Sequence, residues 1–410
     1  MQPVTLKRFG GSDFRANPAY TLVSFDALPP EQQRLLDRLR KGANFFGILL
    51  PREQSGLGIK AVDRDIALLF LTLQQPGKVP DYIKAQLGER YSQTIAEFVL
   101  DGVLAIEREG AFVSGPEAAT LIYEEQPLPI VQGRVARLSL EAVQYAQVLE
   151  LDDLSALSTH LYFYNRLPIS THWKRRFPTP ETVTEYLGLQ AGGPTSLLLE
   201  QQNWSRAWLM PPYDVWLIWA SRHGRSVSQE SKCIYKLYLS PTFEFVRDVL
   251  QITVEALPFI QAAYLKVGKN MSGLLRPDKL LMYFWSFNAL MEASDYLGPK
   301  LAGIPAHGVP FTAEIAGNGL LSWGVDPPIE HEVFSWQDPE SWRQWVTNRL
   351  ARAILMAKMA PACRIEPWRF ALERLRVEGV DIEAWTPTHT MWYTEVEAQD
   401  GNHGPFGTSS

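Results

Sequence analysis

The sequence predicts an α+β fold, in which an N-terminal winged helix-turn-helix domain precedes a larger α+β domain with an antiparallel or mixed sheet. Three observations predict it. Residues 1–115 combine short strand-like runs with three short amphipathic segments. A stretch with several prolines and acids follows at 116–137, and the clearest strand pattern lies beyond it, at 232–240. We therefore expect one domain at 1–130, a second domain at 131–396 and a mobile polar tail at 397–410.

Composition limits the classes of function. The chain has 410 residues, 46% of them hydrophobic, which is enough to bury a sizeable core. A net charge of -6 argues against nucleic acid or an anionic membrane as a main partner. Two cysteines and no HExxH motif give no reason to expect a metal, and no nucleotide-binding motif suggests a cofactor. The N-terminus lacks a signal peptide and no apolar run could span a bilayer, so we expect a cytoplasmic protein.

The first 115 residues follow a winged-helix order. We expect an irregular arm at 1–28, a helix at 31–40 and two strands at 45–50 and 57–62. Three helices then follow, at 66–73, at 79–87 and after the capping residue Ser92, and a hairpin at 103–114 ends the pattern. In a DNA-binding winged helix the third helix enters the major groove. Here that helix reads SQTIAEFVLDG and carries Glu97 and Asp101 without any Lys or Arg. A phosphate backbone would repel these acids, so no nucleic acid is expected as a partner.

A second use of this pattern rests on resemblance. The segments GILLPRE, GLGIKAV, ALLFLTL and IAEFVLDGVLAIE resemble PqqD-type precursor-peptide recognition elements. The resemblance implies that a leader peptide adds a strand to the sheet edge and lies along the third helix. A precursor peptide is then the expected partner, and the residues implied are Leu57, Ile59 and Ala61 on the edge with Thr94, Glu97, Phe98 and Asp101 on the helix. A winged helix used only for packing or dimerisation stays an alternative.

The second half alternates helices and strands. We expect helices at 139–151, 154–164, 243–256, 285–297, 338–360 and 367–378, strands within 196–219 and at 232–240, and a long glycine- and proline-containing loop at 304–328. The strand KCIYKLYLS places Lys236 and Tyr238 on one face and Cys233, Tyr235 and Leu237 on the other.

A charged hairpin is predicted at 264–284. Two apolar strand-like runs flank a turn, and the segment carries Lys266, Lys269, Arg276, Lys279 and one acid, Asp278. Charges between buried strands are costly unless water or a ligand solvates them. Two interpretations follow: a plain hairpin with solvated lysines, or a site for a bound phosphate.

A second resemblance favours the phosphate. The motifs YKLYLSP, VRDVL, AAYLKVGK, RPDKLLMYF and GVPFT…GLLSWGVDPP are similar to HopA-type bacterial type III effectors over about 232–328. Relatives of that family in lanthipeptide gene clusters are taken to be lyases that remove phosphate from phosphoserine or phosphothreonine. The resemblance implies the same reaction here.

The chemistry of such a lyase assigns roles to the charged residues. A lysine can remove the Cα proton if burial or nearby cations lower its pKa, and Lys266 beside Lys269 is the candidate. Lys236 and Arg276 would hold the phosphate, assisted by Lys269 and Lys279, with Asp278 orienting Arg276 or Lys279. Tyr238 and His307 are candidate acids. The alternative for His307 is a loop histidine without a chemical role.

The sequence therefore predicts a protein of peptide natural-product maturation. It would bind a precursor peptide and eliminate phosphate from Ser or Thr residues. Because no GxxxxGK[ST] motif is present, a separate kinase would have to supply the phosphate. The alternatives are a non-catalytic accessory protein that presents the precursor to another enzyme, and an effector-like module that only binds a protein.

Overall fold

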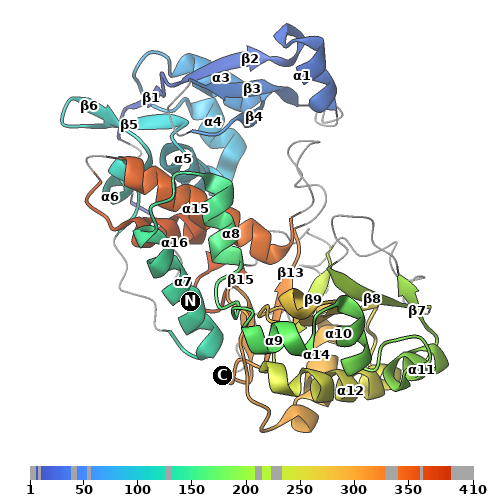
Figure 1. Cartoon of the computed structure of the whole chain (residues 1–410). Helices are drawn as coiled ribbons and strands as arrows, with labels where there is room; N and C mark the ends of the chain where they lie inside the picture. The colour runs from blue at the N-terminus through green and yellow to red at the C-terminus, as the bar shows by residue number, and fades with distance from the viewer. Residues whose placement is uncertain are drawn as a thin grey trace.

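The chain folds into three tiers, shown in Figure 1: an N-terminal tier, a middle tier of helices and a sheet tier. The computed structural model describes residues 6–7, 11–37, 44–52, 57–124, 131–207, 215–222, 233–327, 340–360 and 363–388. The expected tail at 397–410 lies outside these residues. Within the described part, no helix combines the length and the apolar character needed to cross a membrane.

The N-terminal tier contains two three-stranded antiparallel sheets, ordered β2-β3-β4 and β1-β5-β6. Their strands are β1 Phe14–Ala16, β2 Tyr20–Ser24, β3 Phe45–Pro51, β4 Lys60–Asp63, β5 Leu104–Arg108 and β6 Ala111–Val113. The irregular arm predicted for 1–28 is therefore wrong. Phe14 and Ala16 are buried on either side of an exposed Arg15, so this short alternating segment forms the strand that pairs with β5.

Three short helices lie between the two sheets in sequence, in the expected order. The helices of this tier are α1 Pro30–Leu35, α3 Arg64–Thr72, α4 Asp81–Leu87, α5 Tyr91–Leu100 and α6 Ala119–Ile122. Asp63 caps α3 by accepting from the backbone N–H of Ile66 at 2.8 Å. The predicted linker starts too early, because Ala118, Ala119 and Ile122 are fully buried and pack with α5.

The middle tier combines helices from two segments of the chain that are far apart in sequence. Its helices are α7 Arg134–Val148, α8 Leu154–Tyr162, α15 Trp342–Met359 and α16 Pro367–Val377, followed by the short strands β14 Val380–Asp381 and β15 Thr386–Pro387. Helix α15 packs against α8 and α16, and α16 also packs against α5 of the N-terminal tier (Figure 1). Helix α7 begins five residues before the expected Ser139. Gly133 precedes it with a φ of +86°, and the Glu314 carboxylate accepts from the N–H of Val135 at 3.0 Å.

The sheet tier is a seven-stranded antiparallel sheet with the order β12-β13-β9-β11-β10-β8-β7. Its strands are β7 Trp204–Ala207, β8 Trp216–Ser221, β9 Tyr235–Leu239, β10 Tyr264–Gly268, β11 Leu280–Phe284, β12 Ala313–Ile315 and β13 Leu321–Val325. The helices of this tier are α9 Thr171–Arg176, α10 Pro180–Tyr186, α11 Pro194–Gln201, α12 Val246–Ala256, α13 Met271–Leu274 and α14 Phe287–Leu297. Two predictions are wrong here: 304–328 holds two strands, and 194–201 is a helix.

The two faces of this sheet differ in character. On one face Leu237, Leu265 and Met282 are fully buried in the main core, which α12 and α14 complete. The opposite face carries Tyr238 and Leu281 in a separate small cluster, together with the lysines of β9 and β10. The period-two prediction for the KCIYKLYLS strand is thus confirmed over the residues that the structure describes.

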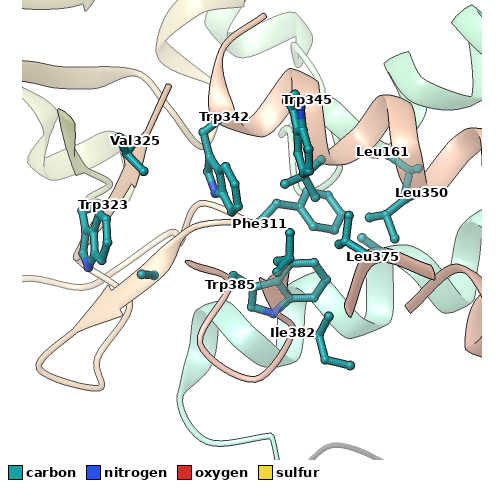
Figure 2. Packing of buried hydrophobic residues seen from close by; sticks show 14 of the residues in the cluster. Leu161, Phe311, Trp323, Val325, Trp342, Trp345, Leu350, Leu375, Ile382 and Trp385 are labelled. Carbon is teal, nitrogen blue, oxygen red and sulfur yellow. The ribbon is translucent and has the colours of Figure 1, made fainter. Parts of the chain in front are cut away.

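An aromatic cluster fixes the start of α15 over that second face (Figure 2). Trp342 and Trp345 stack with 5.7 Å between their ring centroids, and Phe311 meets Trp385 edge-on at 5.2 Å. A Cβ on Gly324 of β13 would lie 2.7 Å from Trp342 Cδ1, so only glycine fits beneath this indole. The first turn of α15 is thereby held against the sheet.

Candidate functional site

The register of the sheet places the candidate residues side by side. Tyr238 on β9 and Lys266 on β10 both pair with Leu281 of the central β11, so the three form one row across the sheet. In the next row, Lys236 pairs with Tyr283. Neighbouring strands lie about 4.8 Å apart, and side chains two residues apart share a face. Lys236, Tyr238 and Lys266 therefore project from the same surface.

Lys266 is half-buried and unpaired within the described part of the chain. Its Nζ lies 4.5 Å from the centroid of the Trp216 ring, and no hydrogen bond or ion pair joins it to another described residue. Burial lowers the pKa of Lys266 from 10.5 to about 8, and the charge of Lys236 acts in the same direction. The sequence assigned that second effect to Lys269, whose charge instead acts on Glu181 of α10. A pKa of about 8 leaves roughly a tenth of the Lys266 amine neutral at pH 7, far more than a pKa of 10.5 would.

Arg276 is oriented by a buried carboxylate. Its Nε and Nη2 donate to the two Asp278 oxygens, both at 2.7 Å, and Arg343 Nη1 donates to Asp278 Oδ2 at 2.9 Å. Burial alone would raise the pKa of Asp278, but Arg276 and Arg343 hold it well below its ordinary value. The guanidinium of Arg276 lies 4.8 Å from the Trp216 ring centroid, so Arg276 and Lys266 contact the same indole. The predicted orienting role of Asp278 agrees with this geometry.

A second ion pair holds Lys236. Its Nζ lies 2.5 Å from Asp326 Oδ2, with side chains 9% and 17% exposed. Asp326 Oδ1 also accepts from the backbone N–H of Trp342 at 2.9 Å, which links this pair to the start of α15. Lys236, Lys266, Arg276 and Arg343 thus face two carboxylates, Asp278 and Asp326. The excess of positive charge suits a phosphate dianion.

Tyr238 stays neutral at physiological pH. Burial raises the pKa of its phenol well above 10.0, and Asp326 adds to the effect. The side chain is almost inaccessible, at 3% exposure, and packs with Leu281 and Val309. Its position beside Lys236 is the predicted one, whereas its role as an acid stays a prediction.

Lys279 and His307 lie in the interior and form a chain of hydrogen bonds between the Pro241 and Asn165 carbonyls. Lys279 Nζ donates to the Pro241 carbonyl at 2.9 Å and is 2.7 Å from His307 Nδ1. His307 Nε2 is 2.6 Å from the Asn165 carbonyl, so it carries the proton. Burial and then Lys279 lower the pKa of His307 to about 3, which keeps the ring neutral. Both ring nitrogens are occupied and Lys279 is fully buried, so neither residue can contact a peptide in this arrangement. The structure favours the structural role for His307 and removes Lys279 from the phosphate-binding set.

The buried Lys279 should make stability depend on pH. Burial lowers its pKa from 10.5 to about 7, so between these values the unfolded chain binds more protons than the folded one. Stability should therefore rise with pH across this window, by more than about 1 kcal/mol, since one pKa unit corresponds to about 1.4 kcal/mol. Lys279→Met should flatten that rise in urea unfolding followed at pH values from about 7 to about 10. The matched control is Lys300→Met at an exposed position; equal slopes in both variants would contradict the prediction.

The residues predicted to bind a leader peptide have different surroundings. Ile59 is 42% exposed beside the edge strand β4, while Leu57 is half-buried and packs on Gly102. Ala61 on β4, and Thr94 and Phe98 on α5, are half-buried.

The acids on α5 face the protein's own C-terminal helix. Asp101 pairs with Lys60 at 2.5 Å and with Arg374 of α16 at 2.6 Å. Glu97 bonds to Gln93, which also donates to the Val377 carbonyl at 3.0 Å. Helix α16 thus covers this side of α5, where Asp101 is paired within the chain, and the use of Glu97 and Asp101 as a peptide wall stays a prediction. The contact between α16 and α5 does not cover the edge strand β4, which is the other surface predicted to bind the leader peptide.

The sequence missed Arg343 and Tyr162. Arg343 is 1% exposed and donates to Asp278, to the Pro310 carbonyl at 3.0 Å and to the Tyr162 carbonyl at 2.6 Å. Tyr162 ends α8, and its hydroxyl lies 3.3 Å from both Arg276 Nη2 and Asp278 Oδ2. Both belong to helices that pack on the site from far away in sequence, and no local motif marks them. Among the described residues, no group of three or more His, Cys, Asp or Glu side chains could hold a metal ion.

Comparison with known proteins finds only distant structural neighbours. No protein-family model matches the chain, and no curated protein matches it significantly. The structure is similar to an effector protein from Pseudomonas syringae pv. tomato strain DC3000, with 13% identity, a TM-score of 0.43 and coverage of 62% of this chain and 98% of that chain. It is also similar to an effector protein from Pseudomonas syringae pv. syringae strain 61, with 12% identity, a TM-score of 0.35 and coverage of 62% of this chain and 99% of that chain. Similarity at this level does not transfer an activity.

Proposed function

We propose that this chain is a cytoplasmic enzyme of peptide natural-product maturation, which eliminates phosphate from phosphoserine or phosphothreonine in a bound precursor peptide. The observation that carries the proposal is the state of Lys266. It is a half-buried amine with a pKa lowered to about 8. It shares the Trp216 indole with an arginine whose carboxylate partner fixes its orientation. A base and a phosphate ligand are thus adjacent on one face of the sheet.

The proposed reaction uses Lys266 as the base. Its neutral amine removes the Cα proton of the phosphorylated residue, and the electron pair of that bond forms the Cα–Cβ double bond. The Cβ–O bond breaks at the same time, and the electron pair leaves with the phosphate. The proton taken from Cα leaves with the phosphate as hydrogen phosphate, so no further reactant is needed. General-base catalysis of this kind contributes about 10²–10⁴-fold.

Arg276 and Lys236 would bind the phosphate. Arg276 uses Nε and Nη2 for Asp278 and Nη2 again for Tyr162, and no described residue bonds its Nη1. That edge of the guanidinium is therefore free for a phosphate oxygen. Lys236 would add charge from the neighbouring strand, while Asp326 holds its ammonium in place.

The N-terminal tier would hold the precursor. In this proposal α3, α4, α5 and the β5–β6 hairpin form a winged-helix, PqqD-like domain, and the leader peptide pairs with the edge strand β4. Backbone hydrogen bonds along an edge strand would give affinity, and Ile59 beside it offers an apolar contact. A partner kinase would act before this enzyme.

The test is incubation of the full-length protein with a phosphorylated peptide. We expect mass spectrometry to show loss of the mass of phosphoric acid and a product that adds a thiol, as a dehydroamino acid does. A non-phosphorylated peptide is the control and should not change. Measurable binding of the phosphopeptide without any elimination would contradict the lyase and favour the non-catalytic accessory protein or the effector-like binding module.

A further inference from the structure

One arginine beside the candidate site lacks a role. Arg166 lies in the loop between α8 and α9, two residues before Pro168. In the structure it is half-buried, and its guanidinium lies 5.3 Å from the Phe163 ring centroid. The guanidinium of Arg276 lies 4.9 Å from the centroid of the same ring.

The loop that carries Arg166 is firmly anchored. Asn165 has a φ of +67°, and its side-chain amide donates to the carbonyls of His307 and Gly308 at 3.1 and 3.2 Å. The Asn165 carbonyl accepts from the His307 ring, and the N–H of Leu167 donates to the Leu275 carbonyl at 3.0 Å. The backbone on both sides of Arg166 is therefore held in place, and the hydrogen bond between His307 and Asn165 is one of the contacts that hold it.

The two guanidinium groups have unequal partners. Asp278 pairs with Arg276, whereas Arg166 donates only to the neutral hydroxyl of Ser272 and makes no ion pair with any described residue. Burial lowers the pKa of Arg166 most, repulsion from the Arg276 cation lowers it further, and the charge of Asp278 acts in the opposite direction. Like charges held together in a half-buried place are stabilised when an anion binds beside them.

We propose that Arg166 binds an anionic group on a substrate residue next to the one that loses its phosphate. This rests on the proposed function. Arg276 lies between the two ends of the site, sharing Trp216 with Lys266 and Phe163 with Arg166. A peptide that places its phosphate on Arg276 and its Cα at Lys266 would bring a neighbouring side chain to Arg166, since residues of an extended chain advance about 3.3 Å each. The enzyme would then prefer sites flanked by a carboxylate or by a second phosphate.

The experiment compares three peptides that differ only beside the reacting phosphoserine, with alanine, aspartate or a second phosphoserine there. We expect the wild-type protein to eliminate phosphate faster, in kcat/KM, from the two anionic peptides than from the alanine peptide, by about 10-fold, which corresponds to about 1.4 kcal/mol. Arg166→Gln should lose this preference. The aspartate and phosphoserine arms show which anion the site favours.

Controls separate this inference from the proposed function. Arg175→Gln, at an exposed position on α9, should keep the preference, and thermal unfolding should show both variants folded. An equal preference in wild type and Arg166→Gln would overturn the role of Arg166 while leaving the lyase intact. If no peptide is eliminated, the lyase fails, and the Kd values of the three peptides for wild type and Arg166→Gln decide the anion site; unchanged Kd ratios would overturn it.

Discussion

Lys266→Arg should slow phosphate elimination by at least about 100-fold while phosphopeptide binding changes little. Arginine keeps the positive charge beside Trp216 and Arg276, but its guanidinium does not deprotonate at physiological pH, so the base is lost and the charge is kept. In the wild type, kcat/KM should rise with pH and level off above about 8, the pKa to which burial lowers Lys266. Steady-state rates on a phosphopeptide and its Kd measure both effects.

The matched control for this variant is Lys300→Arg. Lys300 also lies over an aromatic ring, that of Tyr296 at 4.8 Å, but it is exposed and makes none of the contacts described above for Lys266 and Arg276. Its replacement should leave rates and binding unchanged. Elimination by Lys266→Arg at the wild-type rate would show that another group removes the proton.

Arg343→Met should lower the free energy of unfolding by about 3–5 kcal/mol, because removing one partner of a buried ion pair leaves an uncompensated charge. Arg343 is fully buried, and its loss leaves the Asp278 carboxylate with only Arg276 and Tyr162. The carbonyls of Tyr162 and Pro310 would lose their donors as well. Urea unfolding measures the change.

Two further variants test this explanation. Arg175→Met removes an exposed arginine and should change stability by less than about 0.5 kcal/mol. Arg343→Lys keeps a cation beside Asp278 and should lose less stability than Arg343→Met. A single Arg343→Met variant as stable as wild type would show that Asp278 does not depend on Arg343.

Period-two patterning predicted the local geometry of the central strands correctly. Lys236 and Tyr238 were placed on one face of their strand, and β10 and β11 form the expected hairpin. The prediction failed where local composition misled: glycines and prolines at 304–328 suggested a loop, yet β13 fits there because Gly324 makes room for Trp342. Glycine at a strand position can mark close packing as well as a turn.

The contacts between distant segments could not be predicted from local pattern. Asp278 was expected to orient Arg276, but Arg343 comes from a helix 65 residues further on. Lys279 looked like a further phosphate ligand, although it is bonded to His307 in the interior. Whether a lysine in a charged hairpin points to a site, to water or inward depends on which loop packs over it, and spacing contains no information on that.

Helix α15 has a consequence for how the chain is made. Its 18 residues span about 27 Å at 1.5 Å per residue. Near its start Arg343 reaches Asp278, and further along Arg352 lies against Gly58, where a Cβ would be 3.2 Å from its Nη1. Helix α16 then bonds back to Asp101 and Gln93 across 273 and 284 residues of sequence.

The N-terminal tier is therefore incomplete while the ribosome is still synthesising the last helices. Until α16 emerges, Asp101 has no Arg374 and the side of α5 that this helix covers is bare. Contacts of such long separation form late and slowly. The N-terminal tier can thus complete its contacts with α16 only after the seven-stranded sheet has been translated.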